Sequence, residues 1–393
     1  MNANDNPLNV NLITDNDLCV SCGACKHACP YQEIDLKLNV AKGLYEPFIK
    51  NVVTCLTCDN QPCLQVCPSY EEDFVSLANW SDPTQRIGPV AAIYTGYSTN
   101  RDIRVRSSSG GITRELCRYY LESGLADGII TLKHNTALDY EPYTYTSIDE
   151  LIEQMPCSVY HNINFENAIE ILKNTRGKFV LIGSPCQVTS IRKWQQTCSD
   201  QNSGRIEMTI GFICGWMYSR HTVSHYAKYM GINYENLKDV TYRGGDSIGN
   251  FVLTASSGAE YSFFRRPQFL KHKHAAPFKI AFSRTYASKR CLLCVEHLNF
   301  LADMVVGDAW LERFHEDKIG TSIVIVRNLK AMAVFNQLSA EGHVELTSAS
   351  ENDVTESQSE YFAFSAPARQ IINRLKASGK FVPVFHLPSA WRI

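Results

Sequence analysis

Eight of the fifteen cysteines lie in two short runs whose spacing suits soft metal ligands. The first run, CVSCGACKHACP, has the spacing Cys-x2-Cys-x2-Cys-x3-Cys-Pro, and the second, CLTCDNQPCLQVCP, has the spacing Cys-x2-Cys-x4-Cys-x3-Cys-Pro. Three closely spaced cysteines can wrap one face of a cubane iron–sulfur cluster, whereas the fourth, after three more residues, points the other way. Each proline ends its run, because it fixes φ and has no amide donor.

In bacterial two-cluster ferredoxins the last cysteine of such a run ligates the other cluster. We therefore assign crossed ligands, with Cys19, Cys22, Cys25 and Cys67 on one 4Fe–4S cluster and Cys55, Cys58, Cys63 and Cys29 on its partner. Structural zinc is the alternative, since paired Cys-x2-Cys motifs also bind zinc. Two proline-ended, crossed quartets fit zinc ribbons poorly, so the pattern favours iron.

The composition is that of an ordinary globular protein, and 393 residues suffice for two or three domains. A net charge of -2 provides no field for nucleic acid or an anionic membrane, so we expect neither as a partner. The N-terminal residues lack the basic and apolar regions of a signal peptide, and MTIGFICGWMYS, the longest apolar run, is too short to span a bilayer. We therefore expect a cytoplasmic protein without direct membrane insertion.

Behind the cysteine runs, apolar strands alternate with amphipathic helices. Strands are predicted at ADGIITL, GKFVLIG, IEMTIGFIC, LADMVVGDAW and GTSIVIVRN, and helices at ITRELCRYYLESG, VTSIRKWQQ and SRHTVSHYAKYMG. This alternation indicates a larger α/β domain with a mostly parallel or mixed sheet. The stretch EEDFVSLANWSDPTQRIGPV, with Ser-Asp-Pro and Gly-Pro breaks, predicts a linker in front of it.

Three regions follow from this pattern. We expect an α+β two-cluster ferredoxin-like domain over residues 1–80, the larger α/β domain over residues 86–345, and a mostly helical tail over residues 346–393. The polar segment SASENDVTESQSE is predicted to be a turn or linker within the tail.

Four further cysteines stand near predicted strand ends. Cys186 and Cys214 lie at or just past the carboxyl ends of two strands, where open α/β sheets collect ligands. Cys291 and Cys294 form a Cys-x2-Cys pair shortly before another strand. Four thiols suffice for one more 4Fe–4S cluster. A redox-active dithiol at the pair, with the other two cysteines idle, fits the spacing equally well.

The segment RSSSGG precedes a predicted helix. Free backbone N–H groups and the positive end of the helix dipole at such a start suit a pyrophosphate, and Gly110 and Gly111 allow close backbone approach. The same pattern is typical of an ordinary helix cap. No G-x-G-x-x-G follows a strand and no Walker A lysine is present, so neither a standard NAD site nor a P-loop is expected.

The stretch from Arg265 to Cys294 contains basic side chains and no Asp or Glu. Such a run indicates an anionic ligand or partner, with a solvated surface as the alternative. Its members are Arg265, Arg266, Lys271, Lys273, Lys279, Arg284, Lys289 and Arg290. Asp308 in GDAW, at a predicted strand end, either contacts a ligand or belongs to a buried turn.

The motifs RSSSGG, GSPCQ, CG, YRG, C-x2-C and AD-x3-GD-x-W follow in this order between Ile93 and Arg327. Together they resemble the family of coenzyme F420 hydrogenase and dehydrogenase beta subunits, to which 7-hydroxymethyl chlorophyll a reductase also belongs. Members of that family carry FAD and an iron–sulfur cluster and pass electrons between them. The resemblance implies a third 4Fe–4S cluster at Cys186, Cys214, Cys291 and Cys294. It also implies FAD held by Arg106, Ser107, Ser109, Gly110 and Gly111, with Arg243 and Asp308 as further cofactor contacts.

We therefore expect an iron–sulfur flavoprotein oxidoreductase that uses a ferredoxin or deazaflavin carrier and an unidentified small-molecule substrate. A flavin would gate between one-electron clusters and a two-electron substrate. The sequence indicates no catalytic residue. The alternative is a non-catalytic electron-transfer subunit of a larger redox complex, with the substrate chemistry on a partner chain.

Overall fold

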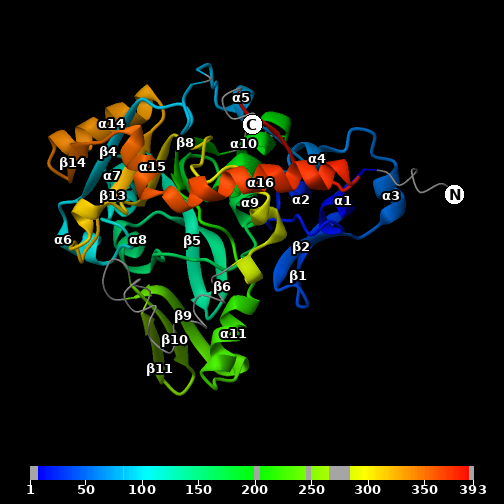
Figure 1. The fold of residues 1–393 in the computed structure, drawn as a ribbon, viewed down its shortest axis with the longest axis horizontal. Coiled ribbons are helices and arrows are strands. Elements are labelled where there is room, and N and C mark those ends of the chain that lie inside the picture. The colour runs from blue at the N-terminus through cyan, green and yellow to red at the C-terminus, as the bar shows by residue number, and fades with distance from the viewer. Residues whose placement is uncertain (1–7, 83, 199–203, 245–248, 265–283, 389–393) are drawn as a thin grey trace.

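The computed structural model describes residues 8–82, 84–198, 204–244, 249–264 and 284–388 (Figure 1). Of the basic run, Arg265, Arg266, Lys271, Lys273 and Lys279 lie outside these ranges. An eight-stranded mixed sheet, ordered β14-β4-β13-β12-β8-β7-β5-β6, forms the centre. Its strands are β4 (Ala92–Ser98), β5 (Gly128–Thr136), β6 (Asp139–Tyr145), β7 (Lys178–Gly183), β8 (Arg205–Phe212), β12 (Met304–Asp308), β13 (Ser322–Val326) and β14 (Val344–Ser348).

The middle of this sheet is parallel, because β5, β7, β8 and β12 pair side by side in one direction. The strands on either side of this centre run antiparallel to their neighbours. The α/β domain with a mixed sheet is therefore confirmed. Since Gly183 at the end of β7 lies opposite Gly211 near the end of β8, the segments that follow these two strands leave the sheet at the same edge.

Helices cover both faces of the sheet, as expected for parallel strands buried on both sides. On one face, Met304 and Val306 pack with Leu116 of α7 and Phe335 of α14. On the other, Val305 of the same strand packs with a second core that includes α10 residue Val188. The main helices around the sheet are α6 (Arg101–Val105), α7 (Ile112–Glu122), α8 (Ile148–Gln154), α9 (Asn167–Asn174), α10 (Pro185–Cys198) and α14 (Leu329–Ala340).

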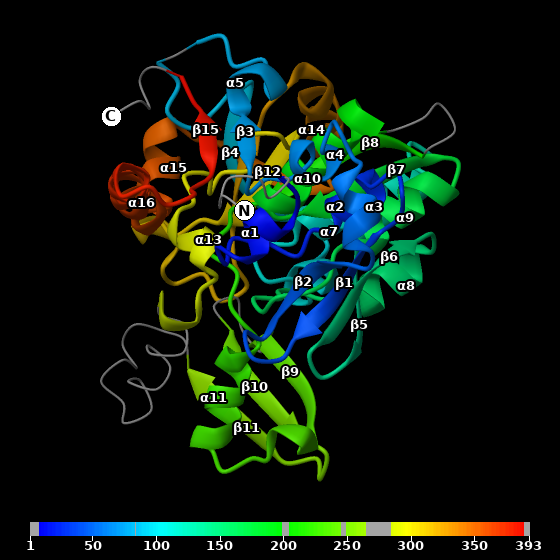
Figure 2. The same ribbon diagram turned by 90° about the vertical axis from the view of Figure 1, so that its right-hand side faces the viewer.

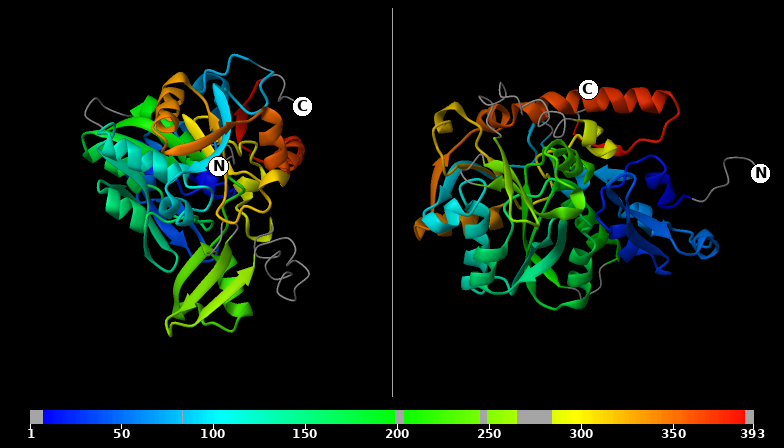
Figure 3. Two further views of the ribbon diagram at one scale, coloured as in Figure 1. Left: turned by 90° about the vertical axis from the view of Figure 1, so that its left-hand side faces the viewer. Right: turned by 90° about the horizontal axis from the view of Figure 1, so that it is seen from below.

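The N-terminal cysteine-rich module (residues 8–70) lies against the α/β domain (Figure 3). It contains the hairpin β1 (Ile34–Asn39) and β2 (Leu44–Ile49) and the short helices α1 (Asn11–Thr14), α2 (Ala24–Ala28), α3 (Val52–Leu56) and α4 (Pro62–Gln65). Ala28 and Val66 of the module share one hydrophobic core with Phe165, Ile191 and Trp194. The module is thus packed into the larger domain rather than tethered to it.

The predicted linker is wrong as a description of EEDFVSLANWSDPTQRIGPV, because this segment folds. It contains β3 (Glu71–Asp73) and α5 (Phe74–Leu77), and the side chains of Phe74, Trp80 and Ile87 are buried. These three apolar residues join the core that also contains Val305. Apolar burial therefore outweighs the Pro and Gly breaks in this segment.

The tail is mostly helical as expected, but the predicted polar turn SASENDVTESQSE is also helical. Helix α15 (Glu351–Ser357) starts there behind a capping box between Ser350 and Asp353, which satisfies the first free amides. Helix α16 (Ser359–Ala377) follows, and β15 (Val384–His386) pairs in parallel with β3. Within the described ranges, no helix combines the length and apolarity needed to cross a bilayer.

A second, antiparallel sheet projects from the domain (Figure 2). Its strands β9 (Leu237–Gly244), β10 (Asn250–Ala255) and β11 (Glu260–Phe264) pack against α11 (His221–Tyr229). The sequence predicted this helix but not the strands. Finally, α13 (Lys289–Leu292) is a short helix that precedes β12.

Candidate redox site

The structure brings thiols of the two cysteine runs close together, and we name the two predicted ligand sets as groups. The proximal group, named for its position against α10, is Cys19, Cys22, Cys25 and Cys67, and the distal group is Cys29, Cys55, Cys58 and Cys63. Burial, followed by the nearby thiols of Cys22 and Cys67, raises the pKa of Cys19. Burial, followed by the thiols of Cys29 and Cys58, likewise raises the pKa of Cys55. The last cysteine of each run thus lies beside the other run, which is the arrangement that crossed ligation requires.

Backbone amides face thiols of the proximal group. The N–H of Ser21 donates to Cys19 Sγ at 3.4 Å, and the N–H of Ser69 donates to Cys67 Sγ at the same distance. Burial raises the pKa of Cys67 to about 12, so the free thiol would be protonated at neutral pH. Amide donors favour the thiolate, the form that binds metal.

The same runs bring the module close to the α/β domain at Gly23. Its φ of 76° lies in the left-handed region, and a Cβ there would lie 2.3 Å from Cβ of Glu166. Only glycine fits this contact. In the part of the chain that the structure describes, no group of three His, Cys, Asp or Glu side chains is placed to hold a single metal ion. Thiolates around a cubane are spread apart, because each iron binds one cysteine.

The third group, Cys186, Cys214, Cys291 and Cys294, gathers at the carboxyl edge of the parallel strands. Cys186 is in the first turn of α10, after β7, and Cys214 follows β8. Burial, then the thiols of Cys214 and Cys291, raise the pKa of Cys186. Burial is the largest effect on Cys294 and raises its pKa. Arg290 opposes this rise, and the thiol of Cys291 adds to it. The structure therefore brings all four thiols together and does not leave the first two apart from the pair.

Hydrogen bonds fix the segments that carry the third group. The N–H of Met217 donates to Cys291 Sγ at 3.4 Å, and Cys294 Sγ donates to the carbonyl of Glu296 at 3.0 Å. The N–H of Cys214 donates to the carbonyl of His297 at 2.9 Å. The strand end, the following loop and the Cys-x2-Cys pair are thus held to one another.

A cavity of about 290 Å³ extends between the third group and the Ser/Gly loop (residues 106–111). From the loop, Ser107, Ser108, Ser109 and Gly111 line it, and Arg243 and Asp308 also contribute to its wall. All four cysteines of the third group line the same cavity. Arg106 is exposed, and neither it nor Gly110 is part of the lining.

Gly110 and Gly111 turn the Ser/Gly loop into α7 with φ values of 69° and 83°. A Cβ on Gly110 would lie 2.9 Å from the backbone N of Ser322, so the loop is packed tightly against β13. Ser109 Oγ donates to the carbonyl of Gly307 at 3.1 Å, and Ser108 Oγ lies 2.9 Å from Ser158 Oγ. The helix start is therefore held against the sheet.

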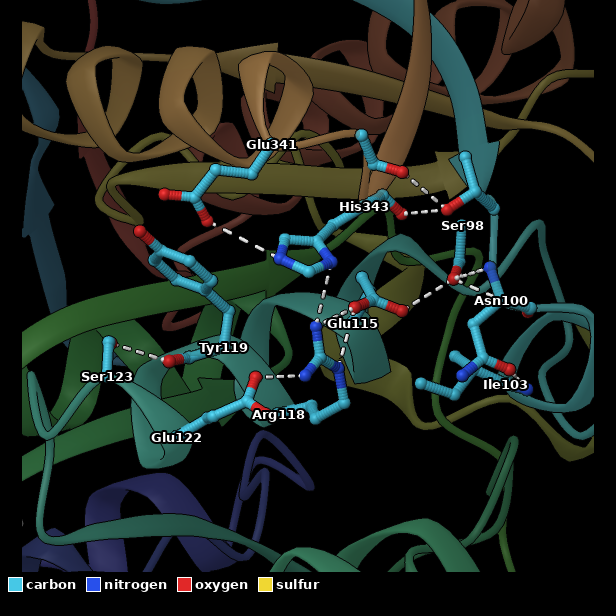
Figure 4. A network of polar contacts seen from close by, with 12 residues as sticks. Ser98, Asn100, Ile103, Glu115, Arg118, Tyr119, Glu122, Ser123, Glu341 and His343 are labelled. Atoms are coloured by element: carbon cyan, nitrogen blue, oxygen red, sulfur yellow. Dashed lines mark hydrogen bonds and ion pairs between the residues drawn. The ribbon is translucent and has the colours of Figure 1, made fainter.

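A polar network of Ser98, Glu115, Arg118 and His343 lies at the start of α7, next to the loop (Figure 4). The N–H of Ser98 donates to the carbonyl of Gly110 at 2.7 Å, and Ser98 Oγ donates to Glu115 Oε2 at 2.6 Å. Glu115, in the first turn of α7, is buried and forms an ion pair with Arg118 at 2.7 Å. Arg118 also contacts His343 Nδ1 at 3.1 Å. This chain of contacts couples the loop to β4 and to the turn before β14.

Arg243 and Asp308 form a two-pronged ion pair in the cavity wall, with N–O distances of 2.7 and 2.9 Å. Burial opposes the charge on Arg243, but Asp308 outweighs this effect and raises the pKa of the guanidinium. Asp308 also presents its backbone carbonyl to Gln358 at 2.7 Å. The neighbouring Trp310 is 45% exposed, which disfavours a buried turn, the alternative to a ligand contact for GDAW.

The sequence did not reveal several residues at the cavity. Ser158 and Cys157 come from a segment with no motif, and Cys157 Sγ donates to the carbonyl of Arg106 at 2.9 Å. Arg290, counted among the solvent-facing or anion-binding residues of the basic run, is buried and lines the cavity. A single sequence carries no local signal for contacts between such distant segments.

Comparisons with known proteins identify the family of the chain. Residues 177–352 match the family model for the C terminus of the coenzyme F420 hydrogenase/dehydrogenase beta subunit, and residues 93–169 match the model for its N-terminal part. Residues 12–32 match a 4Fe-4S binding domain.

Among curated proteins, the chain is 23% identical to coenzyme F420 hydrogenase subunit beta of Methanococcus voltae over 260 residues, which cover 63% of this chain and 81% of that protein. It is 21% identical to a subunit of the F(420)H(2) dehydrogenase of Methanosarcina mazei over 322 residues, or 78% of this chain and 82% of that one. A chain of the F420-reducing [NiFe] hydrogenase complex from Methanosarcina barkeri shares the fold, with a TM-score of 0.57 and 18% identity, over 76% of this chain and 97% of that chain.

Proposed function

Because the chain belongs to the family of coenzyme F420 hydrogenase/dehydrogenase beta subunits and carries a 4Fe–4S binding domain, we propose that it is an oxidoreductase that passes electrons between 4Fe–4S clusters and FAD. The electrons then go to, or come from, an organic substrate or a deazaflavin. One observation carries this proposal: the third group and the Ser/Gly loop line the same cavity.

The cysteines fit three clusters. The proximal and distal groups supply four thiolates each in the crossed arrangement, and the third group supplies four more. The interior around the third group also contains Arg290 Nε, which is buried and has no hydrogen-bond partner among the residues that the structure describes. Such a donor, beside thiols, suits a ligand that carries negative charge.

The Ser/Gly loop fits the pyrophosphate of FAD. Its position at the start of the 11-residue helix α7 supplies free amides and a positive dipole end. Ser107 and Ser109 would contact the phosphates, and the Arg243–Asp308 pair would position the rest of the cofactor. A bound flavin exchanges single electrons with clusters and a hydride with an organic substrate.

The relatives point to a deazaflavin as carrier or substrate. They include subunits of a coenzyme F420 hydrogenase and of an F(420)H(2) dehydrogenase, and the F420-dependent sulfite reductase of Methanocaldococcus jannaschii is 22% identical over 357 residues. This chain covers only 48% of that reductase. We favour a path in which electrons pass from the carrier to the distal, the proximal and then the third cluster, and from there to FAD and the substrate. The same path can also run in reverse.

A second candidate is an electron-transfer subunit of a larger redox complex. One observation favours it: α3, which carries Cys55, has no buried residue, and its Val53 is 73% and Leu56 51% exposed. An apolar surface beside a cluster suits contact with another protein.

Anaerobic purification with iron and flavin analysis tests the proposal. We expect about twelve irons and one FAD per chain, and turnover is then measured with a deazaflavin, a ferredoxin and NADH as candidate donors. Iron without flavin, even after reconstitution with FAD, would establish the electron-transfer subunit instead. Stoichiometric zinc would exclude both functions.

A paired substitution tests the flavin site. Gly110→Ala places a Cβ 2.9 Å from a backbone nitrogen, so the Ser/Gly loop has to move. We expect FAD retention to fall at least tenfold while the iron content is kept. Gly124→Ala is the matched control, because Gly124 has a similar φ of 65° and nothing lies within 4 Å of its Cβ position. Equal FAD retention in the two variants would contradict the assignment.

A further inference from the structure

Two buried or half-buried cations of the α/β domain bond to the segment that ends the proximal group, and one of them directly precedes a cysteine of the third group. Lys193 of α10 donates from Nζ to the carbonyl of Cys67 at 3.0 Å and also to the carbonyl of Glu71. Arg290, directly before Cys291, donates from Nη2 to the carbonyl of Pro68 at 3.1 Å. The segment that ends the proximal group therefore receives a cationic donor from each side.

Arg290 is held rigidly in this position. Its side chain is 3% exposed and pairs at 3.1 Å with Glu72, which is 1% exposed. The guanidinium lies 4.9 Å from the ring centre of Phe385 in β15. A guanidinium cannot be deprotonated in a protein, so the side chain stays charged.

The two cations differ in the cysteine groups that they reach. Lys193 bonds to the carbonyl of Cys67 in the proximal group. Arg290 bonds to the carbonyl of Pro68, which follows Cys67, and directly precedes Cys291 of the third group. A cluster bound by four thiolates carries net negative charge and gains another on reduction, so a nearby buried cation favours the reduced state.

We propose that Lys193 and Arg290 form a cationic clasp that joins the proximal group to the third group and raises the reduction potentials of the clusters bound there. The inference rests on the proposed iron–sulfur function and deepens it. The distal group lies outside the clasp, so its potential is an internal reference. Arg290 and Lys193 are positioning residues, since neither is a cluster ligand.

The test is an anaerobic redox titration of the full chain, followed by EPR, with iron content measured on each sample. In Arg290→Gln, the equilibrium constant for one-electron reduction of the third and proximal clusters should fall at least tenfold, which corresponds to about 59 mV. In Lys193→Gln, the proximal potential should fall and the third stay unchanged. In Arg290→Lys, which keeps the charge, most of the Arg290→Gln shift should be absent.

Arg192→Gln is the matched control. Arg192 neighbours Lys193 on α10 but bonds to Thr209 and Asp303 at 2.9 and 3.1 Å, away from the cysteines. It should leave all potentials unchanged.

The clasp is overturned if Lys193→Gln and Arg290→Gln keep their iron and the wild-type potentials, or if Arg290→Lys shifts as far as Arg290→Gln. If Arg290→Gln does not fold, the proximal potential of Lys193→Gln tests the clasp alone, and a wild-type value overturns it. Missing iron in the wild-type chain would instead overturn the proposed function.

Discussion

The proximal and distal cysteine groups have nearly the same spacing and very different surroundings. Cys22 and Cys25 of the proximal group are buried beneath α10, in cores that also contain residues of the α/β domain. Cys55 and Cys58 of the distal group are only half-buried, and α3 contributes nothing to a core. Local spacing therefore determines which cysteines are ligands. Long-range packing determines how exposed each group is and which charged residues and partner surfaces lie near it.

The largest effect that tests this comparison is loss of a whole cluster. We expect Cys67→Ala and Cys19→Ala to lose the same EPR signal and about four irons each, because they share the proximal cluster. Cys29→Ala and Cys55→Ala should instead lose the distal signal. Electron transfer from the carrier to the flavin should fall at least a hundredfold in all four variants. If Cys67→Ala lost the same EPR signal as Cys55→Ala, the ligation would not be crossed.

The next effect concerns two ion pairs near the boundary between the module and the α/β domain. Glu72→Ala leaves Arg290 buried without its partner, so the free energy of unfolding should fall by about 3–5 kcal/mol. Lys26→Ala removes a more exposed pair with Glu166, whose side chains are 33% and 15% exposed, and should cost less than about 1 kcal/mol. Urea denaturation of the loaded protein measures both. Equal midpoints would show that the buried Glu72–Arg290 pair contributes no more to stability than the more exposed pair.

A smaller effect is the order of chemical attack. With a chelator and an alkylating reagent present, Cys55 and Cys58 should be labelled several times faster than Cys22 and Cys25, because exposure controls access to both iron and thiol. Mass spectrometry of time points gives the order. Simultaneous labelling would indicate that the two groups open as one unit.

The smallest expected effect is on stability at α3. Val53→Ser should change the free energy of unfolding by less than about 0.5 kcal/mol, because the side chain is already exposed. If α3 meets the carrier, the KM for a protein carrier should still rise several-fold. Val40→Ser is the control, since Val40 is 75% exposed at the β1–β2 turn of the same module. An unchanged KM would remove α3 from the contact surface.

Much of the fold followed from local pattern. Apolar runs predicted the parallel strands, and the rule that ligands collect at strand ends brought Cys186 and Cys214 to one edge. What failed depended on distant partners. The segment containing Phe74 and Trp80 resembled a linker because its few apolar residues find their core only in the α/β domain.

Dependence on a distant partner also explains why the burial of Arg290 was not predicted. In a run of one charge sign it indicated a solvated or anion-binding surface, yet its partner Glu72 lies 218 positions earlier in the chain. Likewise, the capping box of α15 lies in a polar segment whose burial depends on Val354. Local composition could not predict either feature.

The pairing of β3 with β15 also bears on the order in which the protein is made. His386 contacts Glu71 across 315 positions. At ribosomal rates of about 5–20 residues per second, roughly 15–60 s pass between synthesis of the last proximal cysteine and synthesis of the strand that covers its neighbour Glu72. During that interval β3 lacks the strand with which it pairs. We therefore expect clusters to be inserted most easily before β15 pairs with β3.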